Sequence, residues 1–228
     1  FLRGEEIRLP QKTTSFKQWA EQLSTFADSP AMKQENPYWS RVEQAQLSPL
    51  PKDMDCDETI GKDSETITIH WTAAETEQLL KQTNHAYHTE INDILLTALG
   101  MAVHDWTGMG EILVNLEGHG REDILPELDI TRTVGWFTSM YPVMITMESG
   151  ADLSRKIKTV KEGLRQIPTK GIGYGISRYL SHGNEGFKLE KNPEISFNYM
   201  GQVNQDSGQD GIKFSPYSSG PSVSENNK

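Results

Sequence analysis

The most unusual local sequence in this chain is a charged stretch that contains two glycines, Glu117-Gly118-His119-Gly120-Arg121-Glu122. It directly follows an apolar run, and ligand-binding side chains in α/β proteins often lie where a buried strand ends. Glycine on both sides of His119 permits a left-handed turn or a close approach of the backbone to a ligand. A carboxylate partly shielded from water at such a place can act as a general acid or base. The alternative is a solvated turn in which the Glu and Arg side chains pair with each other.

Three other stretches combine residue types that suit a ligand site. The stretch from Arg132 to Thr138, which includes Trp136 and Phe137, suits a channel wall, and a bulged core strand is the alternative. The glycines of 171–175 lack the spacing of a dinucleotide loop, so they either present amides to a phosphate or allow tight helix packing. Asn198 and Tyr199 end a predicted strand and point to opposite faces unless a bulge intervenes.

The six histidines and the single cysteine do not form a recognised metal-binding pattern. There is no His-Glu-x-x-His pair and no Cys-x-x-Cys pair, and the three-residue spacing of His85 and His88 is weak evidence. A nucleophile elbow and a Walker loop are missing as well. The sequence therefore predicts no metal site.

Helices and strands that alternate along the chain must hold these stretches in place. The run from Glu111 to Leu116 predicts an interior strand, whose alternation puts Leu113, Asn115 and Glu117 on one face. We expect an α/β or α+β fold with a mixed sheet. The other predicted strands are 65–71, 141–147 and 194–200, with a possible last strand at 212–214. The predicted helices are 15–27, 37–45, one opened by a Thr72–Glu75 capping box, 92–105, 152–167 and 171–180, and 47–63 is a loop.

Composition narrows the class of protein. The chain has 228 residues, 24% charged and 35% hydrophobic, which is the globular range. Its net charge of −10 argues against a nucleic-acid partner, and its apolar runs are too short to cross a membrane. One cysteine and no signal peptide favour the cytoplasm. Five basic residues on the outer face of 152–167 form either a docking patch or a solvated helix face.

Six stretches, taken in order, resemble the successive core motifs of epimerization domains of nonribosomal peptide synthetases, which belong to the condensation-domain superfamily. The resemblance covers about residues 8 to 222. It implies two chloramphenicol acetyltransferase-like lobes in a V, with the active site in a channel between them. The stretches are 9–16, 92–100, 117–122, 132–142, 168–175 and 197–202.

The resemblance concerns the second lobe of that fold. The His-His-x-x-x-Asp-Gly motif of the first lobe has no counterpart, because no two histidines are adjacent here. We therefore expect 1–14 to be a linker from the preceding lobe and 15–228 to be the C-terminal lobe. The first lobe and the extreme C-terminus are expected to be absent, and the missing initiator Met fits a piece cut from a longer protein.

The resemblance also implies roles for single residues. Glu117 matches the acidic catalytic residue, proposed as base or acid at the substrate Cα, and His119 and Arg121 would hold it in place. Asn198 and Tyr199 match the motif near the thioester and count with Glu117 as catalytic. The sister condensation domains lack the Glu-Gly-His-Gly-Arg element. The residues on the channel side are Arg132, Trp136 and Phe137.

The implied function is that of an isomerase in antibiotic biosynthesis. It would convert the Cα of an aminoacyl or peptidyl thioester from L to D while the substrate is attached to the 4′-phosphopantetheine of a peptidyl carrier domain. No cofactor would bind directly, and the partners would be the carrier domain, the N-terminal lobe and neighbouring modules. This lobe alone is expected to be inactive. The alternatives are a non-catalytic carrier-docking lobe and a condensation domain that forms peptide bonds.

Overall fold

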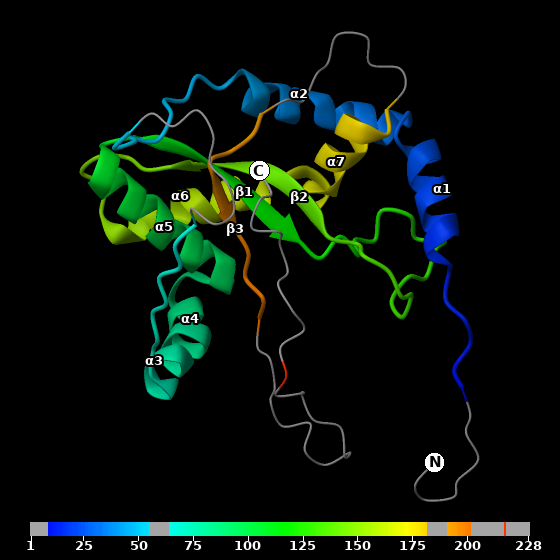
Figure 1. The fold of residues 1–228 in the computed structure, drawn as a ribbon, viewed down its shortest axis with the longest axis horizontal. Helices are drawn as coiled ribbons and strands as arrows, with labels where there is room; N and C mark the ends of the chain where they lie inside the picture. Colours follow the sequence, from blue (N-terminus) through cyan, green and yellow to red (C-terminus); the bar gives the residue numbers. More distant parts are fainter. Residues whose placement is uncertain (1–8, 55–63, 182–190, 202–216, 218–228) are drawn as a thin grey trace, which may run out of the picture. The chain divides into compact units, whose positions relative to one another are not determined.

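The computed structural model describes residues 9–54, 64–181, 191–201 and 217 (Figure 1). The chain divides into two compact units, and each is considered by itself. The first unit comprises 1–48 and 93–198, and the second comprises 49–92 and 199–228. All the candidate residues except Tyr199 therefore belong to the first unit.

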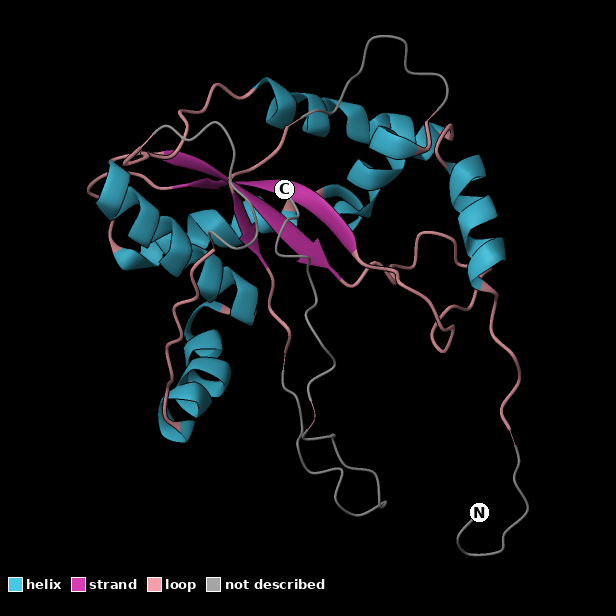
Figure 2. Ribbon diagram, viewed as in Figure 1, coloured by secondary structure: helices cyan, strands magenta, loops and turns pink. Residues whose placement is uncertain are grey.

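The sheet of the first unit, as far as the structure describes it, consists of β1 (Glu111–Gly118), β2 (Ser139–Thr146) and β3 (Ile195–Phe197). The strand order is β2-β1-β3, so β1 is central (Figure 2). β2 runs antiparallel to β1 and β3 runs parallel to it, with Leu116 opposite Phe197. The predicted mixed sheet flanked by helices is confirmed. β3 is shorter than the predicted strand 194–200.

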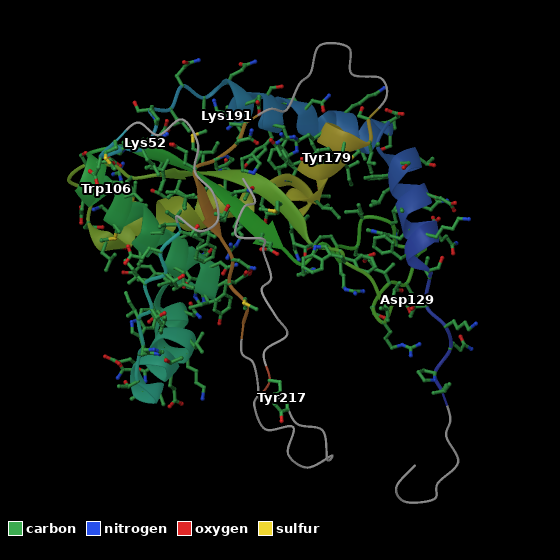
Figure 3. The ribbon with its side chains drawn as sticks, viewed as in Figure 1. Lys52, Trp106, Asp129, Tyr179, Lys191 and Tyr217 are labelled. Atoms are coloured by element: carbon green, nitrogen blue, oxygen red, sulfur yellow. The ribbon has the colours of Figure 1, made fainter. Side chains whose placement is uncertain are left out.

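One face of the sheet is buried, and we call it the dry face. Val114 and its β2 partner Val143 are fully buried there, as the alternation predicts. Helix α5 (Ile91–Thr107) covers this face closely, because a Cβ on Gly100 would lie 2.8 Å from Ile145 Cγ2. At the outer end of α5, Trp106 is exposed (Figure 3).

An ion pair that the sequence analysis missed joins α5 to α6 (Leu153–Arg165). The guanidinium of Arg165 donates to both carboxylate oxygens of Asp93, at 2.9 and 2.8 Å, and Asp93 is fully buried. A bidentate pair of this kind satisfies a carboxylate that would otherwise be costly to bury. Arg165 is one of the five basic residues expected on the outer face of 152–167; its side chain is 39% exposed, and its guanidinium pairs with a buried carboxylate.

Helices α1 (Phe16–Phe26) and α2 (Pro30–Gln44) begin at serine N-caps, Ser15 and Ser29. The predicted helix 37–45 was placed too late, because Ser29-Pro30 is the better start and Pro37 lies inside α2. The apolar sides of these helices meet the loop that follows β1 in a separate cluster. Its buried members are Trp19, Ala27, Met32, Ile130, Phe137, Ile172 and Ile176.

A short 3-10 turn, η3 (Pro168–Gly171), leads into α7 (Ile172–Tyr179). Thr169, Lys170 and Gly171 all have positive φ, at 43°, 49° and 85°. The first two are not glycine, so the backbone is strained here and its surroundings must hold it. A Cβ on Gly171 would lie 2.3 Å from the ring of Tyr141, so the turn also needs glycine for space.

Glu35 lies on α2, is 7% exposed, and stabilises this turn through its buried carboxylate. It accepts the indole N–H of Trp39 at 2.9 Å and the hydroxyl of Thr169. A Cβ on Gly173 would lie 2.0 Å from Glu35 Oε2, so the helix backbone itself lies against the carboxylate. We call this set of contacts, between Glu35, Trp39, Thr169 and Gly173, the Glu35 knot.

In the second unit, the predicted strand 65–71 was wrong. The segment forms no strand, and Ile67, Ile69 and Trp71 are 84%, 78% and 58% exposed. Alternation predicts which face a strand would bury, but a strand also needs a partner for its backbone groups, and none of the described residues pairs with it.

The helical part of the second unit begins as predicted. Thr72 and Glu75 form the expected capping box at the start of α3 (Ala73–Glu77). The helical path continues through a π-helical turn, η2 (Gln78–Gln82), and α4 (Thr83–Tyr87). The possible strand at 212–214 and part of the predicted loop 47–63 lie outside the described residues.

Candidate active site

Glu117 lies near the carboxyl end of the central strand. Its partner on β2 is Met140, and the register of β3 places Asn198 beside it, one residue beyond the Leu116–Phe197 pair. Glu117 and Asn115 share the face opposite the dry face, and both are half-buried. The structure thus brings Glu117 and Asn198 to the same end of the sheet.

The carboxylate of Glu117 makes no hydrogen bond or ion pair with any part of the chain that the structure describes. The predicted alternative, in which it pairs with the arginine of its own motif, therefore does not occur. A half-buried carboxylate with free lone pairs can accept a proton from a bound molecule.

Gly120 turns the chain immediately after Glu117. It has φ of 67°, and a Cβ there would lie 1.6 Å from the backbone oxygen of Phe137. Only glycine can adopt this positive φ without strain and also avoid a clash with the Phe137 backbone. The motif is therefore held directly against the backbone of the neighbouring loop.

Arg121 braces this loop. Its guanidinium donates to the carbonyl oxygens of Ile130 and Thr133, at 2.8 Å for Thr133, and lies 3.9 Å from the ring centroid of Phe137. Together these contacts fix a segment that has no regular secondary structure. Arg121 was expected to hold Glu117, but its contacts go to the 130–137 loop instead.

Both ring nitrogens of His119 also have partners within the chain. Its Nδ1 accepts the backbone N–H of Arg121 at 3.0 Å, so we assign the ring proton to Nε2, which lies 3.2 Å from Glu122 Oε1. The other oxygen of Glu122 is 3.3 Å from Lys170 Nζ on the strained turn. His119 therefore links the motif to the turn before α7, and its own contacts do not include Glu117.

Tyr141 lies on the dry face of the sheet, close enough to Glu122 to feel its charge. Burial, followed by the charge of Glu122 and the nearby Tyr38, raises the pKa of the Tyr141 hydroxyl to about 12. The two faces of the sheet thus differ in character, with a dry phenol on one and an accessible carboxylate on the other.

The residues expected on the channel side have three different positions. Arg132 is exposed, and its guanidinium donates to the carbonyl of Gln11. Phe137 is a core residue whose ring contacts Phe16 edge-on at 5.1 Å, and it lines the same pocket as Trp136. Trp136 is 80% exposed and lines a pocket.

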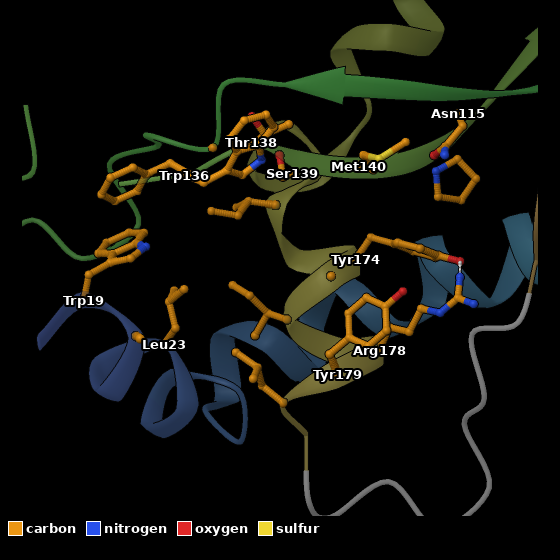
Figure 4. Close-up of a pocket in the computed structure, with 18 of the residues that line it drawn as sticks. Trp19, Leu23, Asn115, Trp136, Thr138, Ser139, Met140, Tyr174, Arg178 and Tyr179 are labelled. Atoms are coloured by element: carbon orange, nitrogen blue, oxygen red, sulfur yellow. Dashed lines mark hydrogen bonds between the residues drawn. The ribbon is translucent and has the colours of Figure 1, made fainter. Parts of the chain in front are cut away.

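That pocket has a volume of ≈ 600 Å³ and lies between the Glu117 face of the sheet, α1 and α7 (Figure 4). Glu117 does not itself line the pocket, but its strand neighbour Asn115 and its cross-strand partner Met140 both do, so the pocket lies beside it. Sequence analysis missed the pocket, although the alternation that placed Asn115 beside Glu117 was the available signal. Its walls include Trp19, Leu23, Asn115, Trp136, Met140 and Tyr179.

Tyr199 is half-buried and belongs to the second unit, so its role beside Glu117 stays a prediction. Among the described residues, no group of three or more His, Cys, Asp or Glu side chains could hold a metal ion. Within the same residues, no helix has the length and apolar character that a membrane span requires.

Comparison with known proteins places these features in context. The family model for the condensation domain matches residues 1–228. A mycosubtilin synthase polypeptide of Bacillus subtilis is 54% identical over 224 residues, which are 98% of this chain and 9% of that protein. Tyrocidine synthase 1 of Brevibacillus parabrevis is 43% identical over 232 residues, which cover 100% of this chain and 21% of that protein.

A solved structure matches over the whole chain. The crystal structure of the epimerization domain from the third module of tyrocidine synthetase B is 47% identical, with a TM-score of 0.89. The match covers 100% of this chain and 51% of that one. The chain therefore spans about half of that domain and a small part of the synthetases that it matches.

Proposed function

The chain belongs to the condensation-domain family, and from that premise we propose that it is the C-terminal lobe of an epimerization domain. In this proposal it inverts the Cα of an aminoacyl or peptidyl thioester from L to D. The substrate is carried on the phosphopantetheine of a peptidyl carrier domain in a cytoplasmic nonribosomal peptide synthetase. The observation that carries the proposal is the available carboxylate of Glu117, whose strand neighbour Asn115 and cross-strand partner Met140 line a pocket.

Epimerization requires a base that removes the proton from the substrate Cα. The Cα–H bond breaks, the proton goes to a carboxylate oxygen of Glu117, and the bonding electrons move into an enolate whose oxygen was the thioester carbonyl. Hydrogen-bond donors near that oxygen stabilise the developing charge. We propose the side-chain amide of Asn198 as one such donor, which its exposure and its place at the same end of the sheet support.

Inversion is complete when a proton returns to the opposite face of the enolate. We propose that the N-terminal lobe supplies this second group, so the present lobe alone is inactive. Arg121 and His119 serve the reaction indirectly, because they fix the turn that directly follows Glu117. The N-terminal lobe, the carrier domain and the neighbouring modules are thus the proposed partners.

The test is Glu117→Gln in an intact module with a loaded carrier domain, followed by the L-to-D ratio of the thioester over time. We expect the rate of inversion to fall by at least about 100-fold, the usual contribution of a positioned general base. Glu111→Gln is the matched control, because Glu111 is an exposed glutamate at the other end of the same strand.

Three results would contradict the proposal. Near-normal inversion by Glu117→Gln would remove Glu117 from the mechanism. Carrier binding without any inversion by the wild-type module would favour a docking lobe. A condensed peptide product with unchanged stereochemistry would favour a condensation domain.

A further inference from the structure

We propose that the pocket beside Glu117 receives the upstream peptide of a peptidyl thioester, and that Asn115 hydrogen-bonds to the backbone of that peptide. This inference rests on the proposed epimerase function and narrows its substrate class. It favours a peptidyl over an aminoacyl substrate.

The size of the pocket is the first argument. Its volume of ≈ 600 Å³ lies within the ~300–1,000 Å³ that enclose a drug-sized ligand. A single amino-acid side chain would leave most of that space to water. A segment of a few residues would fill it.

The lining is the second argument, because a peptide alternates side chains with backbone amides. Aromatic walls suit the side chains, and Trp136 remains 80% exposed although large aromatic residues are usually buried. Polar groups stand on opposite sides of the pocket, with Asn115 on the sheet and the Tyr174 hydroxyl, which accepts from Arg178 at 3.2 Å, on α7 (Figure 4). The described lining includes Arg178 and Lys191 and no acidic side chain, so we expect neutral or acidic peptides to be preferred.

Asn115 is the third argument. Its amide is half-buried and makes no hydrogen bond with the described part of the chain. It offers one acceptor and two donors, the complement of a peptide unit. It stands two residues before Glu117 on the same face, about 7 Å away along the strand. An extended peptide covers that distance in about two residues, so Asn115 meets the backbone just upstream of the reacting Cα.

Gly175 offers a way to fill the pocket without disturbing the fold. It lies on α7 at the pocket wall, and a Cβ there would meet nothing within 4 Å. Gly175→Trp therefore places a large side chain in the pocket. Gly163→Trp is the matched control, because Gly163 lies in helix α6 with equally open space and does not line the pocket.

The experiment compares kcat/KM for exchange of the Cα proton on carrier domains loaded with an aminoacyl or a tripeptidyl group, in the intact module. We expect the wild-type module to prefer the tripeptidyl substrate, and Gly175→Trp to lower the tripeptidyl-to-aminoacyl ratio by about tenfold or more. Asn115→Leu should lower the same ratio by about tenfold, the value of one lost hydrogen bond. Gly163→Trp should leave it unchanged.

Equal kcat/KM on the two substrates, or a ratio that Gly175→Trp does not change, would overturn the peptide pocket. These results differ from a failure of the proposed function, in which the wild-type module would exchange the Cα proton of neither substrate. Circular dichroism of Gly175→Trp and Gly163→Trp checks that both variants fold.

Discussion

Glu35 and Glu117 have the same side chain and opposite surroundings. Glu35 is buried, and both its oxygens are occupied by the indole of Trp39 and the hydroxyl of Thr169. Glu117 is half-buried at a strand end, and its oxygens have no partner among the described residues. The first arrangement uses up the carboxylate to hold a strained turn. The second leaves it available for a ligand.

The contrast also extends to the residues around each carboxylate. The Glu35 knot consists of the groups that touch the glutamate itself. Around Glu117, the stabilising contacts involve neighbouring residues and not the carboxylate itself. Gly120 packs against the backbone of Phe137, and Arg121 donates hydrogen bonds to the 130–137 loop. A reactive group can be positioned rigidly and still remain open if its supports act on the backbone beside it.

Gly120→Ala should have the largest effect on stability and would break the rigid support of Glu117. The new methyl group would collide with the backbone of Phe137 in a left-handed conformation, so we expect a loss of about 3–4 kcal/mol in the free energy of unfolding. Chemical denaturation of the intact module measures it. Gly150→Ala isolates the conformational part, because Gly150 has φ of 77° in open space. Equal losses in the two variants would show that the close approach does not matter.

Glu35→Ala should come next. It leaves the buried indole N–H of Trp39 without an acceptor and removes the bond that holds Thr169, so the free energy of unfolding should fall by about 2–3 kcal/mol. Glu35→Gln keeps an acceptor for the indole and should lose less. Denaturation curves of both variants test this order, and a Glu35→Ala protein as stable as the wild type would mean that the knot does not hold the turn.

The smallest expected effect is a loss of stability at alkaline pH, where Tyr141 ionises. It tests whether the sheet face opposite Glu117 is buried. Because the folded pKa of Tyr141 is raised to about 12, its contribution to stability is fully present below pH 10 and is lost as the pH rises through 12. Ultraviolet titration should show a late-ionising tyrosine that Tyr141→Phe removes. A Tyr141→Phe protein with an unchanged titration curve would contradict the assignment.

Local patterns predicted much of this molecule. Alternation in 111–116 correctly placed Asn115 and Glu117 on one face, and the Thr72–Glu75 spacing correctly predicted a capping box. These features depend on residues close in sequence, where periodicity and capping act. The strand predicted at 65–71 failed because pairing depends on a distant partner.

Long-range contacts explain what the sequence could not reveal. The pair between Arg165 and Asp93 joins residues 72 apart, and the bond from Thr169 to Glu35 joins residues 134 apart. The pocket likewise needs α1, α7 and the sheet together. The resemblance to a family singled out the Glu117 motif, whose catalytic role stays a prediction, and the partners of Arg121 and His119 became visible only in the fold.

The most direct test of the account is wash-in of deuterium at the substrate Cα by intact modules carrying Glu117→Gln or Glu35→Gln, with denaturation curves on the same samples. The account predicts that Glu117→Gln loses exchange and keeps its unfolding midpoint, while Glu35→Gln keeps exchange and unfolds more easily. Deuterium incorporation by Glu117→Gln at the wild-type rate would contradict the central claim that this open carboxylate moves the proton.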